Sequence, residues 1–199
     1  MRRVVGLGNP GTRYIRNRHN IGFVIADAVA RRYRFSAYRD RFKGELAEGT
    51  VAEERRFLLK PETFMNDSGE AVLAAMSFYK IPPGEILVIH DELDLRPGKV
   101  RVKLGGGSAG HNGLRSIDAL IGPDYWRLRI GIGHPGVKEL VHPYVLQNFS
   151  AEEVKQWVEP LVGAVTETMP LLLGGDPPAF MSEVARRFTP PDLDDEEPA

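Results

Sequence analysis

Segments with the pattern of β-strands alternate with segments of helical periodicity along most of this 199-residue chain. Short runs that are apolar or strictly alternating, bounded by Gly, Pro or charged turns, are typical of strands. Six such runs are expected to form strands, at residues 2–8, 43–51, 55–60, 85–90, 99–104 and 126–132. Helices between them predict an α/β fold, in which one domain contains a mixed, twisted β-sheet flanked by helices.

Helical spacing of apolar residues, together with capping residues, predicts where the helices lie. The expected helices cover residues 20–33, 67–80 and 111–121, with C-terminal helices from residue 150 onward. Asp67 and Ser150 each have a glutamate three residues later, which is the spacing of a capping box. Pro160 and Pro170 are expected to bend and end the helix that starts at Ser150, because proline removes a backbone donor.

Residues 1–188 are expected to form the folded domain, since 42% hydrophobic residues supply enough apolar material for a core. Residues 189–199 are rich in proline and acidic residues, so a short disordered acidic tail is expected there. No apolar run approaches the roughly 18 residues of a membrane span. The first residues lack the apolar core of a signal peptide, which predicts a cytoplasmic protein. The absence of cysteine agrees with that location and excludes disulfides, thiolate metal sites and cysteine nucleophiles.

Charge is unevenly distributed, although the net charge is only −1. Residues 1–60 contain 14 Lys and Arg against 6 Asp and Glu, whereas residues 150–199 contain 3 against 11. A basic segment is typical of proteins with anionic partners, of which nucleic acid is the commonest large one. The alternative is a solvated surface with an unrelated acidic tail, and charge alone does not decide between the two.

Polar residues follow several of the predicted strands. Asn9 follows the first strand, Asp91 the fourth, a glycine-rich run at 105–113 the fifth, and His134 the last. In α/β sheets, ligand sites form where strand ends meet loops. The candidate functional residues are therefore sought at these positions.

Gly6, Gly8 and Gly11 match G-x-G-x-x-G, the fingerprint of a dinucleotide site. That site requires a helix to begin at once, so that its N-terminus holds the pyrophosphate. Here Pro10 and a basic loop intervene, and the helix is expected only from about Asn20. We interpret the glycines as a turn that brings the backbone close to another group, and not as a nucleotide site.

Ser108 lies in Gly106-Gly107-Ser108-Ala109-Gly110, which fits the G-x-S-x-G pattern of a serine hydrolase between a strand and a helix. A hydrolase with Ser108 as its nucleophile is therefore one hypothesis. The loop is longer and richer in glycine than a tight nucleophile elbow, which favours a backbone-presenting loop instead.

His19 lies in a polar, basic loop and is the better candidate than His142 for acid–base chemistry near neutral pH. A cap for the following helix is its structural alternative. Asp91 belongs to the run His90-Asp91-Glu92-Leu93-Asp94, whose carboxylates could bind a divalent cation or orient a histidine. The five histidines lack a tight metal-binding spacing. The sequence pattern alone does not pair His19 with Asp91.

Four asparagines, Asn9, Asn20, Asn66 and Asn112, fall in loops or at expected helix starts. Their amides could cap helices and turns. They could equally donate hydrogen bonds to a carbonyl oxygen that gains negative charge.

Lys103 and Arg129 project from the polar sides of two strands that alternate cleanly. If those strands are neighbours, the pair could clamp a phosphate. The alternative is a solvated face of the sheet.

Seven motifs, with Tyr14 between the first two, resemble those of bacterial-type peptidyl-tRNA hydrolases in the same order, and together they cover residues 1 to about 188. They are Val5-Gly6-Leu7-Gly8-Asn9-Pro10-Gly11, Arg18-His19-Asn20, Pro61-Glu62-Thr63-Phe64-Met65-Asn66-Asp67-Ser68-Gly69, His90-Asp91-Glu92-Leu93-Asp94, Lys103-Leu104-Gly105-Gly106-Gly107, Gly110-His111-Asn112-Gly113-Leu114 and Arg127-Leu128-Arg129-Ile130-Gly131-Ile132-Gly133-His134-Pro135-Gly136. That family hydrolyses the ester between a peptide and the 3′-terminal ribose of tRNA, which recycles tRNA during translation.

The resemblance implies a role for each matching residue near the ester. His19 corresponds to the base that activates a water, and Asp91 to the acid that keeps this histidine basic. Asn9 corresponds to the residue that reads the peptide backbone and distinguishes N-blocked from free aminoacyl-tRNA. Asn66 and Asn112 correspond to amides that bind the substrate beside the ester.

The resemblance also implies contacts with the tRNA. Tyr14 and Phe64 correspond to residues at the tRNA 3′ end, and Lys103 and Arg129 to the pair proposed to clamp a phosphate. It implies no metal, no cofactor and a monomer, with peptidyl-tRNA as the nucleic-acid partner. The competing hypotheses are the serine hydrolase acting through Ser108 and an RNA-binding module without hydrolysis.

Overall fold

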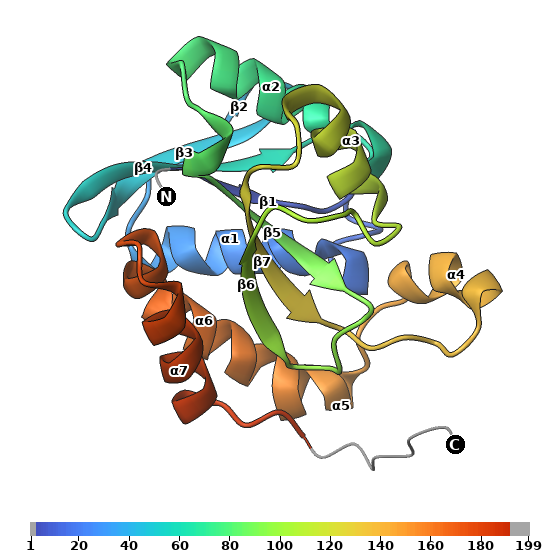
Figure 1. Ribbon diagram of the computed structural model, residues 1–199. Coiled ribbons are helices and arrows are strands. Elements are labelled where there is room, and N and C mark those ends of the chain that lie inside the picture. The colour runs from blue at the N-terminus through green and yellow to red at the C-terminus, as the bar shows by residue number, and fades with distance from the viewer. Residues whose placement is uncertain (1–2, 192–199) are drawn as a thin grey trace.

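The computed structural model describes residues 3–191, and all six expected strands are present in it together with one more. The expected strands are β1 (Arg3–Gly6), β3 (Gly44–Val51), β4 (Glu54–Pro61), β5 (Ile86–Glu92), β6 (Val100–Leu104) and β7 (Trp126–Gly131). The short strand β2 (Arg39–Arg41) was not expected, because three charged or polar residues carry no apolar alternation. The seven strands form one sheet in the order β2-β3-β4-β1-β5-β7-β6 (Figure 1).

The prediction of a mixed sheet is confirmed. The four strands β4, β1, β5 and β7 are parallel neighbours, whereas β2, β3 and β6 run antiparallel to the strands beside them. The carboxyl ends of the parallel strands therefore meet at one edge of the sheet. Asn9, Glu62 and Asp91 lie at or just beyond these ends, where α/β folds form their sites.

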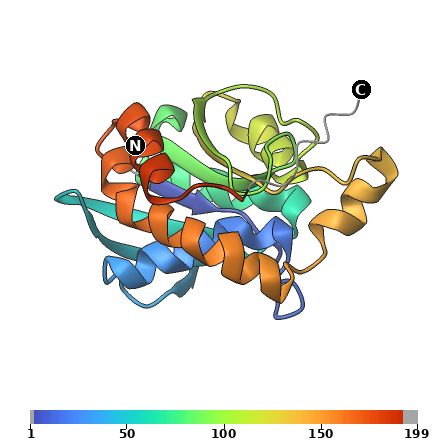
Figure 2. The ribbon, with the colours of Figure 1, turned by 90° about the horizontal axis from the view of Figure 1, so that it is seen from below.

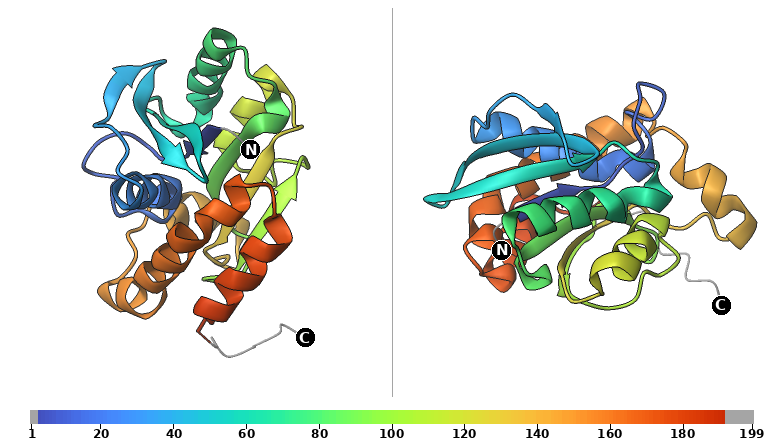
Figure 3. Two further views of the ribbon diagram at one scale, coloured as in Figure 1. Left: turned by 90° about the vertical axis from the view of Figure 1, so that its left-hand side faces the viewer. Right: turned by 90° about the horizontal axis from the view of Figure 1, so that it is seen from above.

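Helices cover both faces of the sheet because successive residues of a strand point to opposite sides. On one face Val4 and Leu58 pack against α1 (Ile21–Arg32), α6 (Glu159–Leu173) and α7 (Pro177–Arg187), which Figure 2 shows from below. On the other face Val5 and Leu59 pack against α2 (Ser68–Tyr79) and α3 (Asn112–Ile121), seen from above in the right panel of Figure 3. Two short helices, α4 (Val141–Val145) and α5 (Ala151–Glu153), connect β7 to α6.

The glycines of the first motif allow α1 to lie unusually close to β1. A Cβ atom on Gly6 would lie 2.4 Å from the carbonyl oxygen of Gly22, and one on Gly22 would lie 2.4 Å from the carbonyl oxygen of Ile89. A Cβ atom on Gly8 would meet the ring of Phe23 at 2.7 Å. These glycines therefore serve helix–strand packing, which agrees with our rejection of a dinucleotide site.

Two predictions about helix ends were wrong. Asp67 makes no side-chain capping bond, because a 3₁₀ turn over Met65–Asp67 leads into α2 instead. Pro160 and Pro170 do not end the C-terminal helix: Pro160 lies in the first turn of α6, and Pro170 lies inside α6, which continues to Leu173. A π-helical segment, Val154–Val158, precedes Pro160 and adjusts the backbone hydrogen bonds there. The capping box at Ser150 is confirmed.

The predicted disordered tail falls almost wholly outside the described part of the chain. Residues 189–191 have no regular secondary structure, and residues 192–199 lie outside the described residues. Within residues 3–191, none of the helices combines the length and the apolar character needed to span a bilayer.

Candidate active site

His19 and Asp91 meet at the carboxyl end of β5. His19 lies in a 3₁₀ turn, Arg18–Asn20, immediately before α1, and Asp91 is the sixth residue of β5. Nδ1 of His19 lies 2.9 Å from each carboxylate oxygen of Asp91. A carboxylate can only accept, so Nδ1 carries the proton and donates it to Asp91. Nε2 of His19 is therefore the nitrogen that has a free lone pair.

His111 is a second histidine on the same carboxylate, and the sequence analysis did not identify it. Its Nε2 lies 2.9 Å from Oδ1 of Asp91, and its Nδ1 accepts hydrogen bonds from the backbone N–H groups of Gly113 and Leu114. These two donors fix the neutral tautomer in which Nε2 carries the proton. Asp91 is thus held from two sides by N–H donors. The signals in the sequence were its place in the motif Gly110–Leu114 and its position directly before a helix, after a glycine-rich loop.

Burial and charge act in opposite directions on the His19–Asp91 pair. Burial disfavours a charged His19, but the charge and hydrogen bond of Asp91 outweigh that effect and raise the pKa of His19. Burial likewise disfavours a charged Asp91, but His19 and His111 hold the pKa of Asp91 well below its usual range. Asp91 is consequently a carboxylate at neutral pH, and His19 is a stronger base than a free imidazole.

His90 lies beneath this cluster and stays neutral. Burial and, to a smaller extent, the nearby His111 lower the pKa of His90 to about 3. Its Nδ1 donates to the backbone oxygen of Asp91 at 2.7 Å, and its ring meets that of His111 edge-on. His90 therefore supports the backbone at Asp91 without adding a positive charge.

His19, Asp91 and His111 also lie close enough together to be considered as metal ligands, since their potential ligand atoms are all within 4.8 Å. A neutral histidine that binds a metal through Nε2 carries its proton on Nδ1. Nδ1 of His111 instead accepts two backbone hydrogen bonds. Metal binding would break both of them, so the hydrogen bonds of His111 oppose a metal at this cluster.

Asn9 lies in the loop before His19 and lines a second cavity, of about 260 Å³, together with Asn20. Its side-chain Oδ1 accepts from the backbone N–H of Met65 at 2.9 Å. This bond assigns the amide orientation and leaves Nδ2 of Asn9 as a donor for another group. Phe64 and Asn66 flank Met65 and are exposed, with Phe64 60% accessible. The hydrogen bond between Asn9 and Met65 therefore joins the loop of Asn9 to the segment that carries Phe64 and Asn66.

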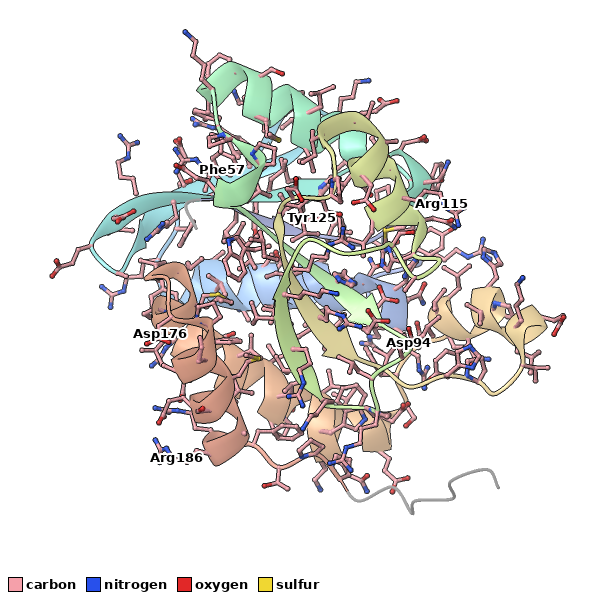
Figure 4. The ribbon with its side chains drawn as sticks, in the orientation of Figure 1. Phe57, Asp94, Arg115, Tyr125, Asp176 and Arg186 are labelled. Carbon is pink, nitrogen blue, oxygen red and sulfur yellow. The ribbon has the colours of Figure 1, made fainter. Side chains whose placement is uncertain are left out.

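A cavity of about 430 Å³ opens next to the histidines. His19 and Asp91 line it together with Asn112, which is the first residue of α3. The side chains of Asp94 and Arg115, labelled in Figure 4, line it from the β5–β6 connection and from α3. The helix α4, which the sequence analysis did not predict, forms the opposite wall with Val141–Val145.

Tyr14 is half-buried in the loop between β1 and α1, where its backbone N–H donates to Gly11. Among the described residues no hydrogen bond connects its side chain to the His19 cluster. The structure therefore places Tyr14 on the same loop as Asn9 and His19 but not in contact with the cluster.

The strands that carry Lys103 and Arg129, the pair predicted to clamp a phosphate, are neighbours. The strands β6 and β7 are antiparallel neighbours, with Arg101 opposite Arg129 and Lys103 opposite Arg127. Lys103 and Arg129 are thus two residues apart in the register, and both line one cavity of about 280 Å³. Nε of Arg129 is also bound to Glu92 at 2.9 Å, which holds its guanidinium in place.

Ser108 does not have the surroundings of a nucleophile. Its carbonyl oxygen accepts from the backbone N–H of His111, and within the described chain no hydrogen bond joins its hydroxyl to a histidine. The helix α3 begins four residues later, at Asn112, so Ser108 is not on a sharp strand-to-helix turn. The glycine-rich loop instead positions His111 and accepts a hydrogen bond from Arg127 at Gly107.

Comparison with known proteins identifies the family. The family model described as peptidyl-tRNA hydrolase matches residues 3–191. A peptidyl-tRNA hydrolase of Rhodospirillum centenum is 58% identical over 191 residues, which is 96% of this chain and 84% of that protein. One of Bradyrhizobium diazoefficiens is 58% identical and covers 92% of this chain and 91% of its own length. The crystal structure of peptidyl-tRNA hydrolase from Acinetobacter baumannii is 42% identical, covers 92% of this chain and 94% of its own, and superposes with a TM-score of 0.87. These matches confirm the resemblance seen in the motifs, and the chain belongs to the peptidyl-tRNA hydrolase family.

Proposed function

We propose that His19 activates the water with which this member of the peptidyl-tRNA hydrolase family cleaves its ester substrate. The observation that carries the proposal is the contact of both Asp91 oxygens with Nδ1 of His19. It fixes the tautomer in which Nε2 is the base, and the carboxylate stabilises the imidazolium that forms when Nε2 accepts a proton. The raised pKa of His19 makes Nε2 a stronger base toward the proton of the water.

His19 alone can carry out the proton transfers of the ester hydrolysis. Nε2 of His19 removes a proton from water, and the water oxygen bonds to the ester carbonyl carbon. The carbonyl oxygen becomes an oxyanion in the tetrahedral intermediate. When the bond to the ribose oxygen breaks, the imidazolium gives its proton to the 3′-terminal ribose, which releases free tRNA and a peptide carboxylic acid. The acid then loses its proton to water and becomes the carboxylate.

Asparagine amides supply the remaining polar groups. Nδ2 of Asn9 donates toward the amide carbonyl of a peptide or N-blocked aminoacyl group. A free aminoacyl group has an ammonium at that place, which cannot accept a hydrogen bond. Asn112, which lines the cavity with His19 and Asp91, and the exposed Asn66 bind the substrate near the ester, where an amide N–H also stabilises the oxyanion.

Contacts with the tRNA hold the ester in place. Tyr14 and the exposed Phe64 present aromatic rings to the unpaired 3′ end, which is recognised by stacking. Lys103 and Arg129 clamp a backbone phosphate. One chain supplies every residue in this scheme, so we propose that the enzyme acts as a monomer. Its substrate arises in translation, which places its activity in the cytoplasm.

Hydrolysis of N-acetyl-aminoacyl-tRNA and of free aminoacyl-tRNA, measured side by side in EDTA, tests this function. The proposal predicts release of tRNA from the blocked substrate only, and full activity of Ser108→Ala. Loss of activity in Ser108→Ala would support the serine hydrolase instead. Hydrolysis of neither substrate by a folded protein that binds tRNA would support the RNA-binding module.

A further inference from the structure

Asn20 holds the backbone of Asn9 through two hydrogen bonds. Oδ1 of Asn20 accepts from the N–H of Asn9 at 2.9 Å, and Nδ2 of Asn20 donates to the carbonyl oxygen of Asn9 at 2.9 Å. One side-chain amide thus satisfies both backbone groups of a residue eleven positions earlier. Neither of the two peptide planes that flank Asn9 can rotate without breaking its bond to Asn20.

The position of Asn20 in the helix shows that its side chain serves Asn9. Asn20 is the N-cap residue of α1, where an asparagine side chain usually accepts a hydrogen bond from the first turn of the helix. It makes no such bond here. The close approach of Gly6 to Gly22 instead brings the start of α1 against the end of β1, so that the amide of Asn20 reaches Asn9.

The side chain of Asn9 is oriented in turn. With its backbone held by Asn20 and its Oδ1 bound to the N–H of Met65, the side chain of Asn9 has its Nδ2 donor left for the cavity that Asn9 lines. Asn20 itself is 1% exposed and has no room to touch a substrate. Asn20 therefore acts through a neighbour, either Asn9, which its amide binds, or His19, which precedes it in the 3₁₀ turn. A change at His19 affects the hydrolysis of both substrates, whereas a change at Asn9 affects the discrimination between them.

We infer that Asn20 is a positioning residue that enables Asn9 to distinguish N-blocked from free aminoacyl-tRNA. This inference rests on the proposed role of Asn9. If the amide of Asn9 were free to turn, Oδ1 could accept from the ammonium of a free aminoacyl group, and the discrimination would be lost. Asn20 holds the backbone of Asn9 where Oδ1 reaches the N–H of Met65, and that bond keeps the amide from turning.

The test is the ratio of kcat/KM for N-acetyl-aminoacyl-tRNA to kcat/KM for free aminoacyl-tRNA. The ratio should fall by about tenfold or more in Asn20→Ala, as in Asn9→Ala, since small misplacements of a substrate-reading group have effects of this size. Asn20→Asp keeps the acceptor for the Asn9 N–H but turns a carboxylate oxygen toward the Asn9 carbonyl oxygen, which repels it, so its ratio should also fall. The affinity for uncharged tRNA should not change in any of these variants, because the phosphate contacts remain.

Asn17→Ala is the matched control. Asn17 is also a buried asparagine of this loop, but its side chain donates to Asn148 and makes no contact with Asn9. Its ratio should equal that of the wild type. If Asn20→Ala does not fold, Asn20→Asp decides the question.

Different results would overturn the positioning role of Asn20 and the proposed role of Asn9. A wild-type ratio in both Asn20 variants, with a reduced ratio in Asn9→Ala, would overturn the inference and leave the role of Asn9 standing. A wild-type ratio in Asn9→Ala would overturn the role of Asn9 and the inference with it. If Asn17→Ala reduced the ratio as much as Asn20→Ala does, the positioning role of Asn20 would also be overturned, because the effect would then be a general loosening of the loop.

Discussion

Both carboxylate oxygens of Asp91 lie 2.9 Å from Nδ1 of His19. The two residues are 72 positions apart in the sequence, and they meet because β5 and the turn before α1 end at the same edge of the sheet. The contact orients the ring, selects its tautomer and raises its pKa. Each of these effects has a measurable consequence.

Asp91→Asn should lower kcat by about 10²- to 10⁴-fold, because an amide no longer selects the basic tautomer or stabilises the imidazolium. The pH profile should change as well. Asp91 raises the pKa of His19 above 6.5, so wild-type activity should fall as the pH drops through a value above 6.5. In Asp91→Asn the midpoint of that fall should move to lower pH. A variant with the wild-type midpoint would show that Asp91 does not act on His19.

His90 should make the protein less stable in mild acid. The folded protein keeps His90 neutral down to about pH 3, whereas the unfolded chain protonates it below about 6.5. The unfolded state therefore binds one more proton in this interval, and the free energy of unfolding falls by up to about 1.4 kcal/mol for each pH unit as the pH decreases. Urea unfolding measured between pH 6 and 4 should show that the free energy of unfolding falls less steeply with decreasing pH in His90→Asn than in the wild type. If the free energy of unfolding changed equally with pH in His90→Asn and in the wild type, His90 would not be the group that titrates.

Lys103→Ala should weaken tRNA binding and reduce the slope of log K against log salt by about one unit, since one phosphate contact is lost. Arg129→Ala should do the same, but it also leaves the buried carboxylate of Glu92 without its cation, so Lys103→Ala is the cleaner variant. Lys155, exposed on the π-helical segment of the other face, provides the control. Slopes that stay unchanged in both clamp variants would rule out the phosphate clamp.

Arg18→Met should destabilise the protein by about 3 kcal/mol, because it removes one partner of a largely buried ion pair. Nη2 of Arg18 contacts both oxygens of Glu153, at 2.7 and 2.9 Å, and the Arg18 side chain is only 9% exposed. Urea unfolding measures the loss. Arg39→Met, at the exposed pair with Glu48, should cost under about 1 kcal/mol. Equal losses in the two variants would mean that burial does not set the strength of the Arg18 pair.

Most of the fold could be predicted from the sequence because local patterns determine it. Alternation and apolar runs gave the six long strands, and the capping box at Ser150 is present. The predictions failed where tertiary contacts decide. The charged strand β2 exists only because it pairs with β3, and α6 continues past Pro170 because it packs against α1 and α7.

The site was predictable only in part. Asn9 and Asp91 could be selected as polar residues at strand ends, but the pairing of His19 with Asp91 depends on how distant segments fold together, and only the family resemblance indicated it. His111 escaped because its role depends on the backbone N–H groups of the next turn, which fix its tautomer. No spacing in the sequence records that kind of contact.

The most direct test of the central claim is the single-turnover hydrolysis of N-acetyl-aminoacyl-tRNA by His19→Ala, with uncharged tRNA binding measured in parallel. The account predicts a rate at least about 10²-fold below that of the wild type, with unchanged affinity for tRNA, because only the base is lost. A rate within about tenfold of the wild type would show that His19 is not the base that activates the water.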